Sequence, residues 1–98
     1  MTAYMVILAE IDDPEQFRHY VTAAAELVAK SGGEYLVRGG GESQCLEGDW
    51  PDGMRLVISK WPSMERARAF WHSDDYDKIK KLRHGHARVK IRLIEGVD

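Results

Sequence analysis

An arginine followed by three glycines is the arrangement in this chain that most directly suggests chemistry. Arg38 comes directly after the apolar residues 35–37, and residues 39–41 are all glycine. A guanidinium at a bend in a strand can hold a carboxylate or an enolate between its N–H groups, assisted by the open backbone amides of the glycines. The alternative is a structural ion pair with an acid such as Glu42 or Glu95. The sequence leaves both interpretations open.

The glycines themselves could form a phosphate-binding loop, a flexible turn or a bend in a strand. A phosphate loop leads into a helix and carries a lysine followed by serine or threonine, whereas residues 42–44 are Glu-Ser-Gln. Residues 50–53, Trp-Pro-Asp-Gly, are typical of a β-turn. We therefore expect a long β-ribbon, bent at residues 39–41 and closed near Pro51. It would fold away from its own sheet toward a partner, with Leu46 and Trp50 as apolar contacts.

Further side chains could complete a ligand site around Arg38. Arg55 begins a later predicted strand, where it either shares the pocket of Arg38 or lies exposed at an edge. Four aromatic residues are expected to pack in the core or to line a pocket: Tyr20, Tyr35, Trp71 and Tyr76. Each tyrosine hydroxyl then needs one hydrogen-bond partner. The predicted ligand contacts are Arg38, Arg55, Tyr35, Trp71 and Tyr20.

Proton transfer is a second chemistry that the sequence allows. His72 lies between Trp71 and Ser73 at a predicted helix junction, where a neutral imidazole can act as a general base near pH 7. The hydroxyl of Tyr76 is the other candidate for handling protons. His72 and Tyr76 are therefore the predicted catalytic residues.

Two histidines near the end of the chain resemble half of a metal site. His84 and His86 are separated by one glycine, but no third ligand follows at a motif spacing, and Cys45 is distant in sequence. We expect both histidines to be exposed beside a basic helix end. Neither a metal nor a cofactor is predicted, and Cys45 has no activating neighbour in the sequence.

Length and composition limit the class of protein. The 98 residues predict a single domain over residues 1–98. A net charge of -2 and a pI near 6.1 provide no field that attracts a polyanion, so we expect no nucleic-acid partner. The first apolar run, residues 4–9, lacks a basic leader and is too short to cross a membrane. With one cysteine and hence no internal disulfide, the expected location is the cytoplasm.

The hydrophobic pattern predicts a β-α-β-β-α-β order. Strands are expected at residues 4–11, 34–38, 54–61 and 89–95, because these runs are apolar or alternating. Asp13 and Pro14 begin the first helix, and Ser63 and Ser73 each cap a part of a second, broken helix. This order predicts a ferredoxin-like α+β fold with a four-stranded antiparallel sheet, strands one and three central and both helices on one face.

The two central strands carry apolar side chains on both faces, although the helices of one copy cover only one. About five side chains left in water, at roughly 1.5 to 3 kcal/mol each, would forfeit about 10 kcal/mol of burial. That is comparable with the net stability of a whole domain. We therefore expect a homodimer in which two sheets pack face to face.

Several stretches resemble the domain-of-unknown-function family 1330 of the dimeric α+β barrel superfamily. They are GGEYLVRGG, LEGDWPDGMRLVISKWPS, FWHSDDYDKIKKLR and IEG, and together they extend over nearly the whole chain. The Gly-Gly-x-Tyr-Leu-x-Arg-Gly-Gly signature and the downstream Trp71, Ser73 and Tyr76 carry the resemblance. It implies a ferredoxin-like protomer and a homodimer, but no established reaction. The wider superfamily includes cofactor-independent antibiotic-biosynthesis monooxygenases, muconolactone isomerases and haem-dependent enzymes, so the fold does not fix the function.

Two functions are consistent with these features. The first is a cytoplasmic homodimer that binds a small acidic or phenolic ligand in a barrel pocket and supports cofactor-independent proton or oxygen chemistry. The second is a non-enzymatic binding or accessory protein with a filled core. A cavity with Arg38 pointing into it favours the first, whereas Arg38 held in an ion pair over a filled core favours the second.

Overall fold

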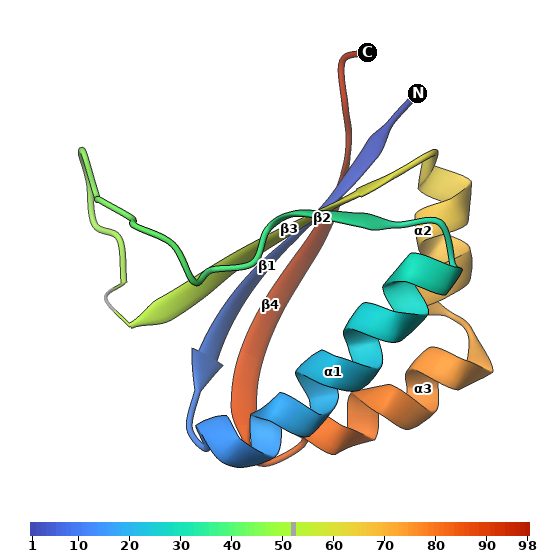
Figure 1. The fold of residues 1–98 in the computed structure, drawn as a ribbon. Coiled ribbons are helices and arrows are strands. Elements are labelled where there is room, and N and C mark those ends of the chain that lie inside the picture. Colours follow the sequence, from blue (N-terminus) through green and yellow to red (C-terminus); the bar gives the residue numbers. More distant parts are fainter. Residues whose placement is uncertain (52) are drawn as a thin grey trace.

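The computed structural model describes residues 1–51 and 53–98, which form the predicted α+β fold. Along the chain the elements are β1 (Ala3–Ile11), α1 (Pro14–Lys30), β2 (Glu34–Val37), β3 (Met54–Trp61), α2 (Met64–Trp71), α3 (Asp74–Lys80), the short 3-10 helix η1 (Lys81–Arg83) and β4 (Ala87–Glu95). All strand pairs are antiparallel, in the order β2-β3-β1-β4. The helices lie together on one side of this sheet (Figure 1). The central positions predicted for the first and third strands are confirmed.

Side-chain caps fix the start of each long helix at the predicted residue. Asp13 accepts a hydrogen bond from the amide of Gln16, and Pro14 occupies the first turn of α1. Ser63 caps α2 in the same way. The Ser73 hydroxyl accepts from the amide of Tyr76 at 3.1 Å and donates to the carbonyl of Phe70 at 2.8 Å. Ser73 therefore ends α2 and begins α3, which explains the break in the second helix.

The core lies between the sheet and the helices. Met5 and Ala9 of β1 face the helices with Trp61 of β3, and all three are almost completely buried. The Trp61 ring packs on Phe70 of α2 at a centroid distance of 4.8 Å. Its indole N–H donates to the hydroxyl of Ser59 at 2.9 Å. The buried polar side chain of Ser59 therefore has a hydrogen-bond partner.

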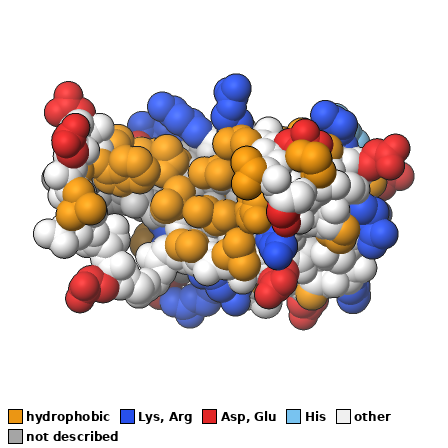
Figure 2. Space-filling model, turned by 90° about the horizontal axis from the view of Figure 1, so that it is seen from above, with side chains coloured by type: hydrophobic (Ala, Val, Ile, Leu, Met, Phe, Trp, Pro, Cys, Tyr) orange, Lys and Arg blue, Asp and Glu red, His pale blue; other side chains and the backbone are white. Residues whose placement is uncertain are grey.

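The opposite face of the sheet carries a central apolar row, and no helix of the described residues covers it (Figure 1). The antiparallel register places Val6 of β1 beside Ile58 of β3, and their side chains point away from the helices because their neighbours point inward. The same face includes Tyr4, Leu8, Leu56 and Ile94, and Ile94 is 44% exposed. Figure 2 shows hydrophobic side chains gathered across the middle of the molecule. We call this surface the open face.

The prediction of a β-ribbon beyond the second strand was wrong. β2 ends at Val37, and residues 38–51 form no strand in the structure. Residues 39–51, here called the arm, contain no β-branched residue, and the positive φ of Gly39 and Gly48 interrupts an extended backbone. The strand irregularity lies earlier than predicted, between Tyr35 and Val37. The predicted turn at residues 50–53 includes Asp52, which lies outside the described residues.

Within residues 1–51 and 53–98, no helix combines the length and the apolar character that crossing a membrane requires.

Candidate functional site

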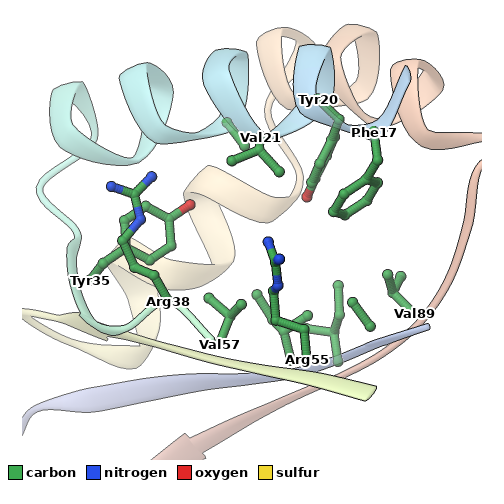
Figure 3. Close-up of a pocket in the computed structure, with 12 residues that line it drawn as sticks. Phe17, Tyr20, Val21, Tyr35, Arg38, Arg55, Val57 and Val89 are labelled. Atoms are coloured by element: carbon green, nitrogen blue, oxygen red, sulfur yellow. The ribbon is translucent and has the colours of Figure 1, made fainter. Parts of the chain in front are cut away.

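A cavity of about 60 Å³ lies between α1 and the sheet (Figure 3). Because one ordered water needs about 10 to 15 Å³ measured in the same way, the cavity can accept a small molecule. Most of its wall is apolar, but two arginines and two tyrosines also line it: Arg38, Arg55, Tyr20 and Tyr35. The sequence predicted these four residues as ligand contacts.

Small side chains explain why this part of the core is hollow. Ala9 of β1 faces α1, with Arg55 of β3 and Val89 of β4 as its neighbours across the sheet. On the helix, Ala24 lines the same cavity, and both alanines are almost completely buried. Neither methyl group reaches far enough to fill the layer between helix and sheet. The space between α1 and the sheet therefore remains open beside Ala9 and Arg55.

Arg55 points toward α1 from β3, and Arg38 from the position directly after β2 (Figure 3). The guanidinium of Arg38 lies 4.8 Å from the centre of the Tyr35 ring, a distance typical of a cation–π contact. Within residues 1–51 and 53–98, no carboxylate lies within ion-pair distance of Arg38 or Arg55. In particular, Arg38 is not paired with Glu42 or Glu95. Two positive charges at the cavity are thus available to a ligand.

Gly39 is the one glycine of the triplet that the geometry requires. Its φ of +78° belongs to the left-handed region, and an added Cβ would overlap Cγ of Arg55 and lie 3.0 Å from the carbonyl oxygen of Leu56. By contrast, a Cβ on Gly40 or Gly41 would meet nothing within 4 Å. Gly39 therefore leaves the room through which the Arg55 side chain reaches the cavity.

A pair of tyrosine hydroxyls lies behind the cavity. The hydroxyl oxygens of Tyr20 and Tyr76 are 2.7 Å apart, and Tyr76 is only 2% exposed. Burial raises the pKa of the Tyr20 phenol far above its ordinary value, and the neighbouring Tyr76 raises it further. Burial also raises the pKa of Tyr35, against the opposing charge of Arg38. Both cavity tyrosines are therefore protonated at neutral pH and can donate hydrogen bonds.

The sequence did not identify the pairing of Tyr20 with Tyr76 or the arginine beside it. The Arg83 guanidinium lies 5.4 Å from the centre of the Tyr20 ring, and its buried Nε has no hydrogen-bond partner among the described residues. These three residues come from α1, α3 and η1, so no local spacing indicates their contact.

His72 and Trp71 lie away from the arginines. His72 ends α2 and is exposed, and both residues line a second cavity of about 280 Å³ beside α2. Of the residues that the structure describes, Ile91 alone lines both this cavity and the one beneath α1. The Trp71 ring is covered by the amine of Lys80 at 4.2 Å. The structure therefore brings Tyr20, Tyr35, Arg38 and Arg55 together, but places Trp71 and His72 at a different site.

The remaining candidates form no cluster. His84 is exposed, and His86 is partly buried with Nδ1 3.9 Å from a carboxylate oxygen of Asp13. In the described part of the chain, no three His, Cys, Asp or Glu side chains are arranged as metal ligands. The exposed Cys45 thiol contacts only the carbonyls of Glu47 and Gly48, within its own segment.

Comparison with known proteins supports the family and the fold. A family model described as a domain of unknown function (DUF1330) matches residues 2–97. No curated protein matches the chain.

Solved structures resemble the chain over nearly its whole length. A protein of unknown function from Rhodopseudomonas palustris has a TM-score of 0.79 at 14% identity, covering 99% of this chain and 83% of that one. SnoaB, a cofactor-independent oxygenase from Streptomyces nogalater, has a TM-score of 0.72 at 12% identity, covering 99% and 94%. A hypothetical Arabidopsis thaliana protein has a TM-score of 0.68 at 15% identity, covering 98% and 88%. At these identities the likeness shows the fold alone.

Proposed function

Because the chain belongs to the domain of unknown function family DUF1330 and has the fold of the dimeric α+β barrel superfamily, we propose its function from the cavity beneath α1. The protein binds a small organic acid or phenol there, with the anionic oxygen held by Arg38 and Arg55. The observation that carries this proposal is the presence of two guanidinium groups on an apolar cavity that no described carboxylate neutralises.

The chemistry of the wall defines the ligand. Charged hydrogen bonds from a guanidinium to a carboxylate contribute about 1.5 to 3 kcal/mol each, more than neutral ones. Val21 and Val57 offer apolar contact, so the ligand needs an apolar body beside its charge. The protonated hydroxyls of Tyr20 and Tyr35 can donate to a second oxygen. A planar aromatic acid has all three features, whereas a phenolate has the charge and the apolar body but a single oxygen.

The same cavity would support proton or oxygen chemistry without a cofactor, and the neighbour SnoaB is described as a cofactor-independent oxygenase. Either hydroxyl can donate in the Tyr20–Tyr76 hydrogen bond, and when Tyr76 donates, the Tyr20 proton is free for a ligand oxygen in the cavity. Tyr76 would thus handle protons through Tyr20. His72 would take part only with a ligand that extends into the second cavity, because it does not line the first.

We also propose that a second copy covers the open face, making the protein a homodimer. Without such cover the apolar row of Val6, Leu8 and Ile58 would remain in contact with water. Light scattering should then give twice the chain mass of 11.2 kDa. The free, exposed thiol of Cys45 suits a reducing compartment, and we assign the protein to the cytoplasm.

Ligand binding is tested by thermal shift and calorimetry with benzoate, 4-hydroxybenzoate and phenol, and with uncharged benzamide as a control. A ligand at a hundred times its Kd should add about 2.7 kcal/mol to the free energy of unfolding. For a domain of this size that raises Tm by roughly 10 to 20 °C. Benzamide should have a much smaller effect.

Variants assign the effect to the cavity. Arg38→Gln and Arg55→Gln should each weaken benzoate binding by about 10- to 100-fold, the equivalent of one charged hydrogen bond. Arg18→Gln is the matched control, because Arg18 is exposed on α1 and does not line the cavity. Equal binding by all three variants would contradict the proposal. No response of the wild-type protein to any acid or phenol would favour the accessory protein without a ligand.

A further inference from the structure

The arm and the exposed side of β4 carry opposite charges. Residues 39–51 contain three acids, Glu42, Glu47 and Asp49, and no lysine, arginine or histidine. On β4, Arg88, Lys90 and Arg92 alternate along the strand and point to the open face, beside Glu10, Leu8 and Val6 of β1. One acidic and one basic segment therefore flank the same apolar surface.

The arm stands away from the rest of its own chain (Figure 1). Leu46 is 86% exposed and Trp50 is 49% exposed, although both are large and apolar. Between the arm and the open face lies a groove of about 610 Å³, whose apolar walls include Leu36, Trp50 and Leu56. An exposed apolar groove of this size is typical of a surface that receives another protein segment.

Among the described residues, the arm makes no ion pair with the basic strand of its own chain. It leaves the sheet at β2, and β4 is at the other edge, three strand spacings or about 14 Å away. Arg88 already binds Glu10 at 2.7 Å and Asp12 at 3.3 Å. Lys90 and Arg92 have no carboxylate partner among residues 1–51 and 53–98. Their charges remain available to another chain.

Two kinds of two-fold axis can bring two open faces together. An axis across the strands places β2 over β2 of the second copy, so the arm stays far from β4. An axis along the strands places β2 of each copy over β4 of the other. The arm leaves the sheet at the end where Met54, Glu10 and Arg88 form one row, so this second axis brings it onto the basic residues.

We propose that the arm of each copy lies across β4 of its partner, with Glu47 and Asp49 facing Lys90 and Arg92 of the partner subunit. The groove beneath the arm, whose walls include Met54 and Leu56, then lies over the stretch of β4 of the partner that begins at the partner's Arg88. This inference rests on the proposed homodimer and specifies its axis. Charge pairing at the rim of the interface selects this orientation over the alternative, in which the arm does not meet β4.

Charge reversal tests the contact. The arm variant Glu47→Lys/Asp49→Lys and the strand variant Lys90→Glu/Arg92→Glu should each raise the dimer Kd about tenfold or more at low salt. A chain with all four substitutions should return to within about threefold of the wild-type Kd, because the pairing is restored with reversed sign. Lys78→Glu/Lys81→Glu, on the helical side, is the matched control and should leave the Kd unchanged.

Mixing the two reversed variants provides a second measurement. A tagged arm variant and an untagged strand variant should form heterodimers in preference to either homodimer, since both contacts of the heterodimer pair opposite charges. Native mass spectrometry separates the three species. The preference should disappear at high salt, where exposed charges are screened.

The outcomes separate this inference from the proposals on which it rests. A dimeric wild type whose Kd is unchanged by the strand variant, or a fourfold variant that does not recover, would overturn the arm contact while leaving the dimer intact. A wild type that stays monomeric at micromolar concentration would refute the dimer itself. Benzoate binding is measured on the same variants and should be retained, because the four reversed residues lie outside the cavity.

Discussion

Replacing Gly39 with alanine should damage both stability and ligand binding, whereas the same change at Gly40 should do neither. A non-glycine residue in the left-handed region costs about 1 to 2 kcal/mol, and Gly39 has a φ of +78°. In addition, the new Cβ would overlap the Arg55 side chain, which must move. Gly40 has no positive φ and nothing within 4 Å of an added Cβ, so it is the matched control.

The expected difference is large for a chain of this length. Each kcal/mol lowers Tm by about 4 to 8 °C, so Gly39→Ala should lose roughly 4 to 16 °C. Gly40→Ala should change the free energy of unfolding by no more than about 0.5 kcal/mol. Scanning calorimetry measures both, at equal protein concentrations because the melting of the proposed dimer would depend on concentration.

Benzoate calorimetry then tests the link to Arg55. If Gly39 leaves room for that side chain, Gly39→Ala should lose affinity about as strongly as Arg55→Gln, while Gly40→Ala keeps it. Two alanine variants that melt within about 2 °C of each other would show that the close approach of Gly39 to Arg55 has no energetic consequence. The inference that Gly39 leaves room for the Arg55 side chain to reach the cavity would then be wrong.

Three further outcomes follow from the tyrosine pair and the helix break. Tyr76→Phe should lower the free energy of unfolding by about 1 to 3 kcal/mol, because it leaves the Tyr20 hydroxyl buried without its partner. In urea unfolding, the double variant Tyr20→Phe/Tyr76→Phe should lose less than the sum of the two single variants. The folded chain raises the pKa of Tyr20 above that of an unfolded tyrosine, so the contribution of Tyr20 to the free energy of unfolding should be intact below about pH 10 and lost as the pH rises further. Between about pH 9 and 11 the free energy of unfolding should therefore fall less steeply in Tyr20→Phe than in the wild type. Ser73→Ala should destabilise by about 1 kcal/mol or more and exceed Ser63→Ala, because only the Ser73 hydroxyl also bonds the end of the preceding helix.

The fold could be predicted because local signals agreed with the long-range pattern. Asp13, Ser63 and Ser73 were identified as caps from residue type and position, and each accepts the expected amide. The central strands were recognised from apolar runs with side chains for both faces. Such signals depend on a few neighbouring residues, so a single sequence contains them in full.

The arm was wrongly predicted as a β-ribbon because its backbone conformation depends on contacts that the sequence does not specify. A glycine triplet and a Trp-Pro-Asp-Gly sequence are compatible with a hairpin, but a ribbon also needs residues that favour the extended backbone. Residues 39–51 provide neither β-branched side chains nor an adjacent strand. In these circumstances turn chemistry alone does not create a ladder.

The candidate site was predicted in its composition but not in its grouping. Six elements contribute to the two cavities, and Trp71 and His72 belong to the second because α2 ends above β4 and not above the arginines. The sequence analysis had assigned Trp71 to the ligand contacts and His72 to the catalytic residues of the same site as Arg38. The distance between the cavities depends on helix packing, which short-range spacing does not encode.

Arg55 is the residue whose position argues most strongly for a ligand. In β3 the side chains of Arg55, Val57, Ser59 and Trp61 point toward the helices, and the last two fill the core. An arginine at the end of a core-facing row costs stability unless water or an anion meets its charge. Here a hydrophobic residue would extend the core over Ala9, and Gly39 would not need to be small. Arg55 is exposed, so water meets its charge when the space is empty, and the glycine that leaves room for it and the open space above it are what the proposed binding of an anion requires.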